Sequence, residues 1–424
     1  MVQAPAFYND RQQVSSLPFD VRHELEKHNI LKVGEHVVHF TGFVLGKDKL
    51  HVFLPRNTAL SAKTSKQKLR NAALLMRGIR RYLNERPSIE TAEEGDGDVG
   101  AFQLSLVTDL LEDFCTNGVY SKRFREHVKN TGKFNWKRTI SSQTAFIGES
   151  GPVYLDIDGT RQHYVSDCEV ARVHAQIIRK LDQSYSWIIT GTDVEISGEI
   201  SHIPDSLMEV EAQIAVLEKE LLSVYAERDI RLIHLMIRYL KSTRGAERGS
   251  LIGLRHFHYM WEKMLDSSLK WVFPVNQLLA IPSYRFKDGT LKQAASKAQR
   301  TDTVLKAPKS NKYVVIDAKY YGASDIQSAP GWGDIVKQFF YAKALKVYAQ
   351  NAEVGNAFVF PGSGPLHSVH MIERGKSRGV LDEDYPPIRC FYLDPMELIE
   401  CYVNGSKLDR FSASLLSQKC TSQI

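Results

Sequence analysis

Two acidic residues and one lysine have the types and spacing needed to bind a divalent cation and cleave a phosphodiester bond. Residues 303–305 and 313–319 are rich in β-branched and aromatic side chains, which predicts two strands joined by a short polar turn. Because side chains alternate along a strand, Asp317 and Lys319 lie on the same face of the second strand. Asp302 begins the first strand and can approach the same point if the two strands pair across the turn.

These side chains suit metal-dependent hydrolysis of a phosphate ester. Magnesium prefers hard oxygen ligands and keeps several waters, so Asp302 and Asp317 could coordinate it together with water and a DNA phosphate. Lys319 would orient or help deprotonate the attacking water and offset the charge that develops on the phosphate. We therefore expect Mg2+ as the cofactor, with Mn2+ able to replace it. The alternative is an edge strand whose acid and base form a solvated ion pair of little energetic value.

Helices predicted on either side of this hairpin add further candidates. Residues 255–265 show the apolar spacing of a helix, and Glu262 adjoins the apolar stripe, from which it could supply a third oxygen ligand. An ordinary flanking residue is the alternative for this acid. Residues 331–345 predict a second helix, on which Gln338 and Tyr341 lie three apart on one face. Both could bond a phosphate or support the lysine.

The order of helix, strand, strand pair, helix and strand resembles the PD-(D/E)xK nuclease superfamily, and more closely its McrC/LlaJI group of restriction subunits. Four segments carry the resemblance: Trp261-Glu262, Asp302 with Val-Ile-Asp-Ala-Lys-Tyr-Tyr at 315–321, Lys337-Gln338 with Tyr341, and residues 132–140, which look like that group's Gly-x-x-Asn-Trp-Lys-x-Thr segment.

One position departs from the superfamily pattern, because Thr301 stands where the superfamily name has proline. Asp288 therefore remains an alternative to Asp302 as the first acid. Asp302 is preferred because it begins the strand that pairs with the Asp317 strand. Asp288 lies in Lys-Asp-Gly-Thr, which is a turn sequence.

The resemblance implies a fold and an activity. The fold class is α/β (multidomain α+β), with a C-terminal PD-(D/E)xK core whose mixed sheet is flanked by helices. The activity is that of a magnesium-dependent DNA endonuclease subunit in a prokaryotic restriction system that defends against phage. In that group, cleavage of double-stranded DNA depends on an AAA+ GTPase or ATPase motor subunit of the McrB type. The implied catalytic residues are Asp302, Asp317, Lys319, Glu262, Gln338 and Tyr341.

Two other readings stay open. The chain could be a stand-alone type II restriction endonuclease whose recognition part lies in its first half. It could also be a scaffold and activator of a motor ring that keeps a vestigial nuclease site, although the preserved acid, acid and lysine argue against this. No nucleotide-binding Gly-x-x-x-x-Gly-Lys-Ser/Thr loop is visible, so a motor would have to be a separate subunit.

The composition is that of a mildly basic globular protein. Its 424 residues are 43% hydrophobic and 25% charged, which is enough for two or three domains with apolar cores. A formal charge of +6 and a pI near 8.8 suit a polyanionic partner. The five cysteines form no CxxC pair, which argues against zinc and disulfides, and no apolar run could span a bilayer. We expect a cytoplasmic protein without a membrane partner.

The pattern of elements divides the chain into three regions. Residues 1–60 are β-rich, residues 61–250 are mostly helical and would contact a partner or DNA, and residues 251–424 form the nuclease domain. Within the middle region, three basic residues surround two aromatic ones and are candidates for DNA backbone contacts. They are Lys133, Lys137 and Arg138, and the alternative is that Trp136 anchors this segment structurally.

Overall fold

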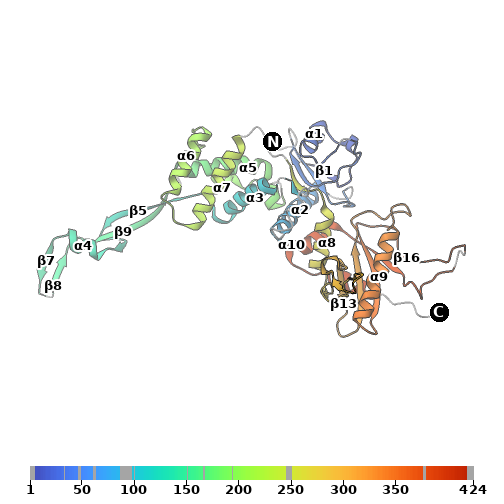
Figure 1. The fold of residues 1–424 in the computed structure, drawn as a ribbon. Coiled ribbons are helices and arrows are strands. Elements are labelled where there is room, and N and C mark those ends of the chain that lie inside the picture. The colour runs from blue at the N-terminus through green and yellow to red at the C-terminus, as the bar shows by residue number, and fades with distance from the viewer. Residues whose placement is uncertain are drawn as a thin grey trace. The chain divides into compact units, whose positions relative to one another are not determined.

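The computed structural model describes residues 5–32, 34–45, 49–60, 64–85, 98–99, 101–149, 151–165, 168–192, 194–244, 251–375 and 379–417. These residues form helices and several mixed or antiparallel sheets, which confirms the predicted α/β class (Figure 1). The chain divides into two compact units. One is Phe102–Arg248, and the other combines Val2–Ala101 with Gly249–Ile424.

A five-stranded sheet opens the second unit and combines four strands from residues 6–99 with one from residues 251–254. Its order is β1-β3-β2-β10-β4, with β1 (Ala6–Asn9) parallel to β3 (Leu50–Leu54) and β2 (Thr41–Leu45) antiparallel to β3. The strand β10 (Leu251–Leu254) pairs antiparallel with β2 and with β4 (Asp98–Val99). Its first residue, Leu251, is fully buried in the apolar core that helix α1 (Phe19–Lys27) covers.

The same unit contains the predicted hairpin in a second five-stranded sheet, of order β13-β14-β15-β17-β16. β13 and β14 are antiparallel, β15 and β17 continue the sheet in parallel with β14, and β16 pairs antiparallel with β17. Helices α8 and α11 contact β14, and α9 contacts β14 and β15. The bounds are β13 Thr303–Lys306, β14 Lys312–Ala318, β15 Glu353–Pro361, β16 Ser368–Val369, β17 Ile388–Leu393, α8 Phe257–Ser268, α9 Trp332–Tyr348 and α11 Asp409–Leu416.

Helix α2 (Ser65–Glu85) joins the two sheets through α8 and α10 (Pro395–Asn404). Gly78 allows the close approach, because a Cβ at this position would lie 2.9 Å from Ile399. The contact continues where the Arg81 guanidinium stacks on the Tyr402 ring, 4.6 Å from its centroid. Arg81, one of the basic residues of α2, is therefore part of the contact between α2 and α10.

The other unit has a helical core and a long β arm. Helices α3 (Ala101–Asn117), α5 (Glu169–Thr190), α6 (Val210–Leu221) and α7 (Glu227–Arg244) bury a common apolar core. Between α3 and α5 the chain leaves this core as the antiparallel strands β5 and β9, which project from the helices of their unit (Figure 1). The arm comprises β5 Lys122–Lys129, β6 Lys133–Phe134, α4 Trp136–Ser142, β7 Ala145–Gly148, β8 Gly151–Tyr154 and β9 Asp158–Val165.

This grouping differs from the three-part division expected from the sequence. The β-rich start and residues 64–85 belong to the unit that holds the second sheet, and residues 102–248 are inserted between β4 and β10. The local patterns identified the elements, but they carried no signal that β10 pairs with a strand roughly two hundred positions earlier, because strand partners far apart in sequence leave no local trace. No helix in the described part of the chain is long and apolar enough to cross a lipid bilayer.

We expect the insertion to be removable and the first sixty residues not to be. Val99 pairs with Gly253 in adjacent antiparallel strands, so a short turn can replace residues 102–248. The shortened chain should still unfold cooperatively in a thermal melt followed by circular dichroism. Deleting residues 1–60 should abolish that transition, because β10 and Leu251 lose their packing partners. Cooperative melting of the second variant and not of the first would contradict this division.

Candidate active site

Strand register brings the two predicted acids together at one end of the β13–β14 hairpin. Thr303 pairs with Ile316, which places Asp302 beside Asp317 one step further along the antiparallel pair. The backbone N–H of Ala318 donates to Asp302 Oδ2 over 2.8 Å and fixes that carboxylate. The structure therefore joins the two acids that sequence reasoning paired.

The environment of Asp302 favours its neutral form. Surrounding protein displaces much of its water, and the Asp317 carboxylate lies within hydrogen-bonding reach; together they raise the pKa of Asp302 to about 8, with a smaller contribution from Glu262. Asp302 is nevertheless an exposed residue, and solvent screening weakens both effects relative to those on an enclosed carboxyl group. A bound cation would relieve this repulsion.

Lys319 lies between two carboxylates. Its Nζ is 2.8 Å from Asp317 Oδ2 and 2.8 Å from Asp334 Oδ1, and its side chain is only 14% exposed. Burial disfavours the ammonium, but the two acids outweigh that effect and raise the pKa of Lys319. The lysine is thus a fixed positive charge beside the acid pair.

Asp334 is a site residue that sequence reasoning missed. It lies in the first turn of α9 and also accepts a hydrogen bond from the Tyr321 hydroxyl over 3.4 Å. A signal was present, because residues 334, 338 and 341 have the spacing of one helix face. That face was assigned to Gln338 and Tyr341 alone, although its first member is the one that contacts Lys319.

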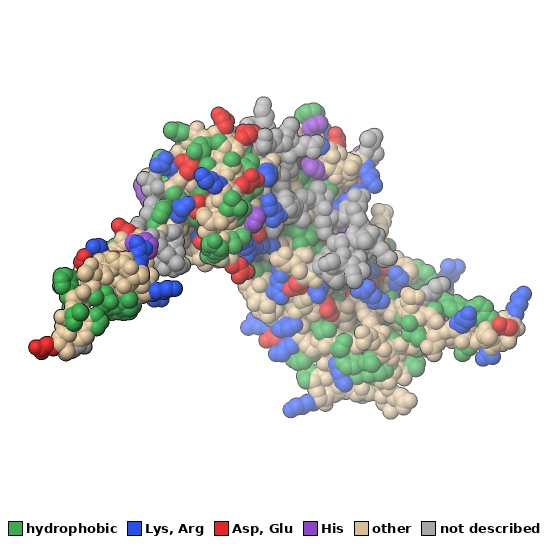
Figure 2. All heavy atoms as spheres, turned by 60° about the vertical axis from the view of Figure 1, so that its left-hand side comes forward, with side chains coloured by type: hydrophobic (Ala, Val, Ile, Leu, Met, Phe, Trp, Pro, Cys, Tyr) green, Lys and Arg blue, Asp and Glu red, His purple; other side chains and the backbone are tan. Residues whose placement is uncertain are grey.

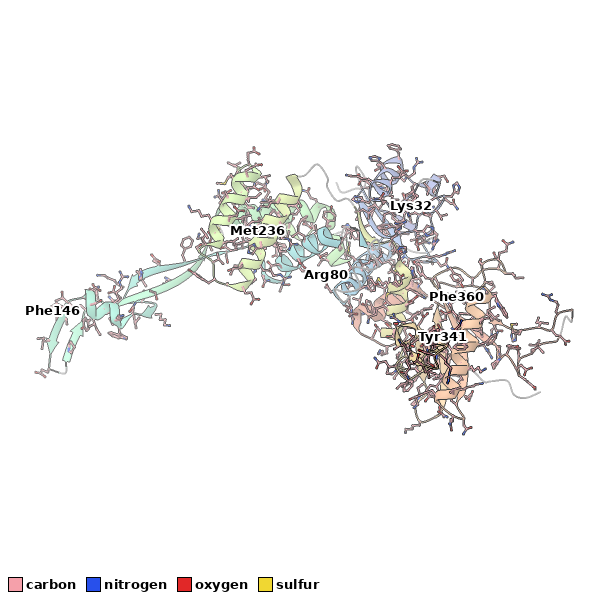
Figure 3. The ribbon with its side chains drawn as sticks, viewed as in Figure 1. Lys32, Arg80, Phe146, Met236, Tyr341 and Phe360 are labelled. Carbon is pink, nitrogen blue, oxygen red and sulfur yellow. The ribbon has the colours of Figure 1, made fainter. Side chains whose placement is uncertain are left out.

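The other two residues of this α9 face have different surroundings. Gln338 is fully buried, and among the described residues neither polar atom of its amide has a hydrogen-bond partner. Asn356 on β15 is also buried with an unpartnered amide. Burial, followed by the charges of Asp302 and Asp317, raises the pKa of Tyr341, which Figure 3 labels on α9. Tyr341 therefore belongs to the acid cluster, and Gln338 does not bond Lys319 in the described structure.

Glu262 reaches the site from α8 through a shared cleft of about 960 Å³. It acts on Asp302 through its negative charge. One turn further along α8, Asp266 accepts a hydrogen bond from Thr303 Oγ1 over 3.1 Å. The polar residues lining this cleft include Glu85, Glu262, Lys263, Asp266, Asn276, Gln277, Arg300 and Asp302. The cleft opens directly onto the first acid of the pair.

The chemistry of the donors fits a hard divalent cation. Asp302 and Asp317 offer carboxylate oxygens that repel one another in the absence of a cation. Within the described ranges, no group of three His, Cys, Asp or Glu side chains is close enough to form a metal site. Asp302 and Asp317 are thus the residues that could hold a metal, and the role of Glu262 as a third ligand stays a prediction.

Asp288, the alternative first acid, lies elsewhere. Its carboxylate accepts hydrogen bonds from the backbone N–H and the hydroxyl of Thr290, over 2.9 and 2.7 Å, in an exposed turn. These bonds lower the pKa of Asp288. They give this acid a turn-forming role and leave Asp302 as the partner of Asp317.

The basic segment at residues 132–140 forms part of the arm. Asn135 caps α4 by accepting from the Arg138 N–H over 3.1 Å, and the buried Thr139 donates its hydroxyl proton to the Asn135 carbonyl. These bonds explain the Asn and the Thr of the segment. Lys133, Lys137 and Arg138 are exposed, and so is Trp136, at 52%, which does not fit a buried anchor. Their contact with DNA stays a prediction.

Comparisons with known proteins agree with the sequence resemblance. The family model described as LlaJI restriction endonuclease matches residues 40–373. The type II restriction enzyme BsuMI component YdjA of Bacillus subtilis (strain 168) is 25% identical over 299 residues, which cover 63% of this chain and 62% of that protein. The chain therefore spans less than two-thirds of that relative.

Solved structures show weaker likeness. A chain from the half-complex of Thermococcus gammatolerans McrB AAA+ hexamers with bound McrC is 12% identical, with a TM-score of 0.41 and coverage of 96% of this chain and 100% of that one. A chain of the Thermococcus gammatolerans McrBC complex is 10% identical, with a TM-score of 0.27 and coverage of 62% and 85%.

We expect the acid pair to make stability depend on pH. A carboxyl whose pKa is raised on folding stabilises the protein while protonated; for Asp302 this contribution is lost as pH rises from about 4, the unfolded value, to about 8. In metal-free buffer, the melting temperature of the wild type should therefore fall relative to that of Asp302→Asn across this range. Added Mg2+ should restore the wild type at high pH and not the variant. A difference in melting temperature between the wild type and Asp302→Asn that stays the same at every pH would contradict the account.

Proposed function

Because the chain belongs to the LlaJI restriction endonuclease family, we propose that it is a magnesium-dependent DNA endonuclease subunit whose catalytic centre is Asp302, Asp317 and Lys319. The observation that supports this most is the contact of the two acids beside a lysine held at 2.8 Å from Asp317. The surrounding sheet and helices suit a PD-(D/E)xK core, which is part of the same proposal.

The residues divide the work of phosphodiester hydrolysis. Asp302 and Asp317 would hold Mg2+, or Mn2+ in its place. When bound, the metal would supply a Lewis acid for the phosphoryl oxygen and a more acidic water. Lys319 Nζ donates hydrogen bonds, so it would orient the water or the phosphate and offset the developing negative charge. Asp334 keeps this ammonium in place from α9.

The residues around this centre have supporting roles in the proposal. Glu262 lines the same cleft as Asp302 and would contribute an outer or direct oxygen. Tyr341 lies within range of both acids, where its hydroxyl could bond a phosphate. Gln338 carries a buried amide whose unmet hydrogen bonds cost about 1–3 kcal/mol, a cost that suits a functional position.

We propose an AAA+ motor subunit of the McrB type as the partner. Three observations support it. The chain has no nucleotide-binding loop of its own, the similar YdjA protein is named as one component of an enzyme, and the arm carries exposed apolar side chains (Figure 2). Those side chains, all between 46% and 98% exposed, are Phe134, Trp136, Ile140, Phe146, Ile147, Val153 and Leu155. Such a surface suits contact with a protein.

The name of the relative YdjA also favours a second candidate. It is a component of a type II restriction enzyme, so this chain could cut DNA within such an enzyme without a motor. The two candidates share the catalytic centre and differ in whether cleavage needs nucleotide hydrolysis. A cleavage assay with and without GTP or ATP separates them.

We expect alanine at Asp302, Asp317 or Lys319 to abolish DNA cleavage while the protein stays folded. Losing a metal carboxylate or the fixed charge should slow the chemical step by at least about a hundredfold. Glu353→Ala is the matched control, because it removes an exposed acid that pairs with Lys312 at the opposite end of the β14–β15 pair from Asp317. Wild-type cutting by a folded Asp317→Ala protein, or loss of cutting in Glu353→Ala, would place the site elsewhere.

The arm should bind the partner independently of catalysis. We expect Phe146→Ser/Ile147→Ser to weaken association with the AAA+ subunit at least tenfold, because these exposed residues of β7 would be buried in the complex. Phe146 is labelled on the arm in Figure 3. Asp317→Ala should associate like the wild type. Equal binding of the arm variant in analytical ultracentrifugation would remove the arm from the interface.

A further inference from the structure

In the sequence, a small two-stranded hairpin lies between helix α8 and the β13–β14 hairpin. Strands β11 (Ser283–Arg285) and β12 (Leu291–Gln293) pair antiparallel, with Tyr284 opposite Lys292. The turn between them contains Gly289 at φ +86° and is closed by a hydrogen bond from the Phe286 N–H to the Thr290 carbonyl over 2.8 Å. Local bonds therefore define a folded ribbon.

Both faces of this ribbon are exposed to solvent. Every residue of β11 and β12 is exposed, although a two-stranded ribbon normally covers one face by packing. The exposed residues include three large apolar side chains, at 48%, 49% and 57% exposure, which are Tyr284, Phe286 and Leu291. A folded ribbon with two exposed faces and exposed apolar side chains has the properties of an element that binds another molecule.

The charged and aromatic side chains of the ribbon indicate which class of molecule it binds. Arg285, Lys287 and Lys292 are all exposed, and the Lys292 ammonium lies 5.3 Å from the centroid of the Phe286 ring. Asp288 is the one acidic residue between positions 278 and 300, and its carboxylate accepts hydrogen bonds from the N–H and hydroxyl of Thr290 within the turn. A surface that carries cations and aromatic rings is better suited to bind a nucleic acid than to bind an apolar surface of another protein.

The ribbon also continues from the candidate active site. Asn276 and Gln277 lead into it and Arg300 leads out of it, and all three line the cleft that contains Asp302. Asn276 holds the returning chain by accepting from the N–H and hydroxyl of Thr301, over 2.9 and 2.8 Å. Thr301 directly precedes Asp302 in the chain. A duplex placed at the acid pair would therefore pass the base of the ribbon.

We propose that the β11–β12 ribbon contacts double-stranded DNA beside the cleavage site and holds the duplex in the cleft. The major groove of B-DNA admits a two-stranded β ribbon, and the basic side chains on both faces of this one can reach the phosphates that border the groove. This inference rests on the proposed nuclease function and adds the element that retains the substrate.

Salt-dependent DNA binding by the full chain tests this inference. The variant is Lys287→Gln/Lys292→Gln, and binding of a short duplex is followed by fluorescence anisotropy without divalent metal, so that the DNA stays intact. The variant should bind more weakly at low salt. Each lost phosphate contact should also reduce the slope of log affinity against log salt by about 0.9, and two contacts by about 1.8.

Lys309→Gln/Lys346→Gln is the matched control, because it removes the same charge from exposed positions. Lys309 lies in the turn at the far end of the β13–β14 hairpin from Asp302, and Lys346 lies in the last turn of α9. The control should match the wild type. The inference is overturned if the ribbon variant matches the wild type, if the control loses as much, or if the wild-type chain binds no duplex at low salt. The proposed nuclease function is judged separately, by cleavage and its loss in Asp317→Ala.

Discussion

Two carboxylates that repel each other are held together at the end of one strand pair, and the surrounding structure serves to keep them there. The register of β13 and β14 sets Asp302 beside Asp317, and a slip of one residue would turn one of them to the opposite face. The Ala318 N–H and the Lys319 ammonium supply the nearest favourable contacts. The acid pair and the lysine are therefore held in the arrangement that the proposed metal-dependent cleavage requires.

The loop that follows strand β3 of the N-terminal sheet contacts the strand ends next to the candidate site. Tyr320 follows Lys319 in the chain, packs on Trp261, and accepts a hydrogen bond from the Arg56 N–H over 2.8 Å. The side chain of Asn57 donates to the Pro361 carbonyl at the end of β15 over 3.0 Å. These contacts join the loop after β3 to the ends of β14 and β15. The second sheet and the β-rich start thus belong to one unit, and the start of the chain holds the strand ends next to the candidate site.

Local sequence patterns predicted the proximity of Asp302, Asp317 and Lys319 because it follows local rules. Alternation along a strand placed Asp317 and Lys319 on one face, and a short turn brought Asp302 beside them. Asp334 was not predicted, because its role depends on how α9 packs over β14, and helical spacing alone does not say which residue of a face meets the strand. The pairing of β10 with β2 was not predicted either, because the two strands lie far apart in the sequence. Trp136 is half-exposed although aromatic residues usually pack inside, so burial could not be judged from residue type.

The most direct test of the central claim is the position of a bound metal in a crystal of the full chain soaked with Mn2+. We expect a single anomalous peak in contact with Asp302 and Asp317 in the wild type, and its loss in Asp317→Ala. The same map shows whether Glu262 reaches the ion. A peak at other acids that persists in Asp317→Ala, with none at the Asp302–Asp317 pair, would contradict the account.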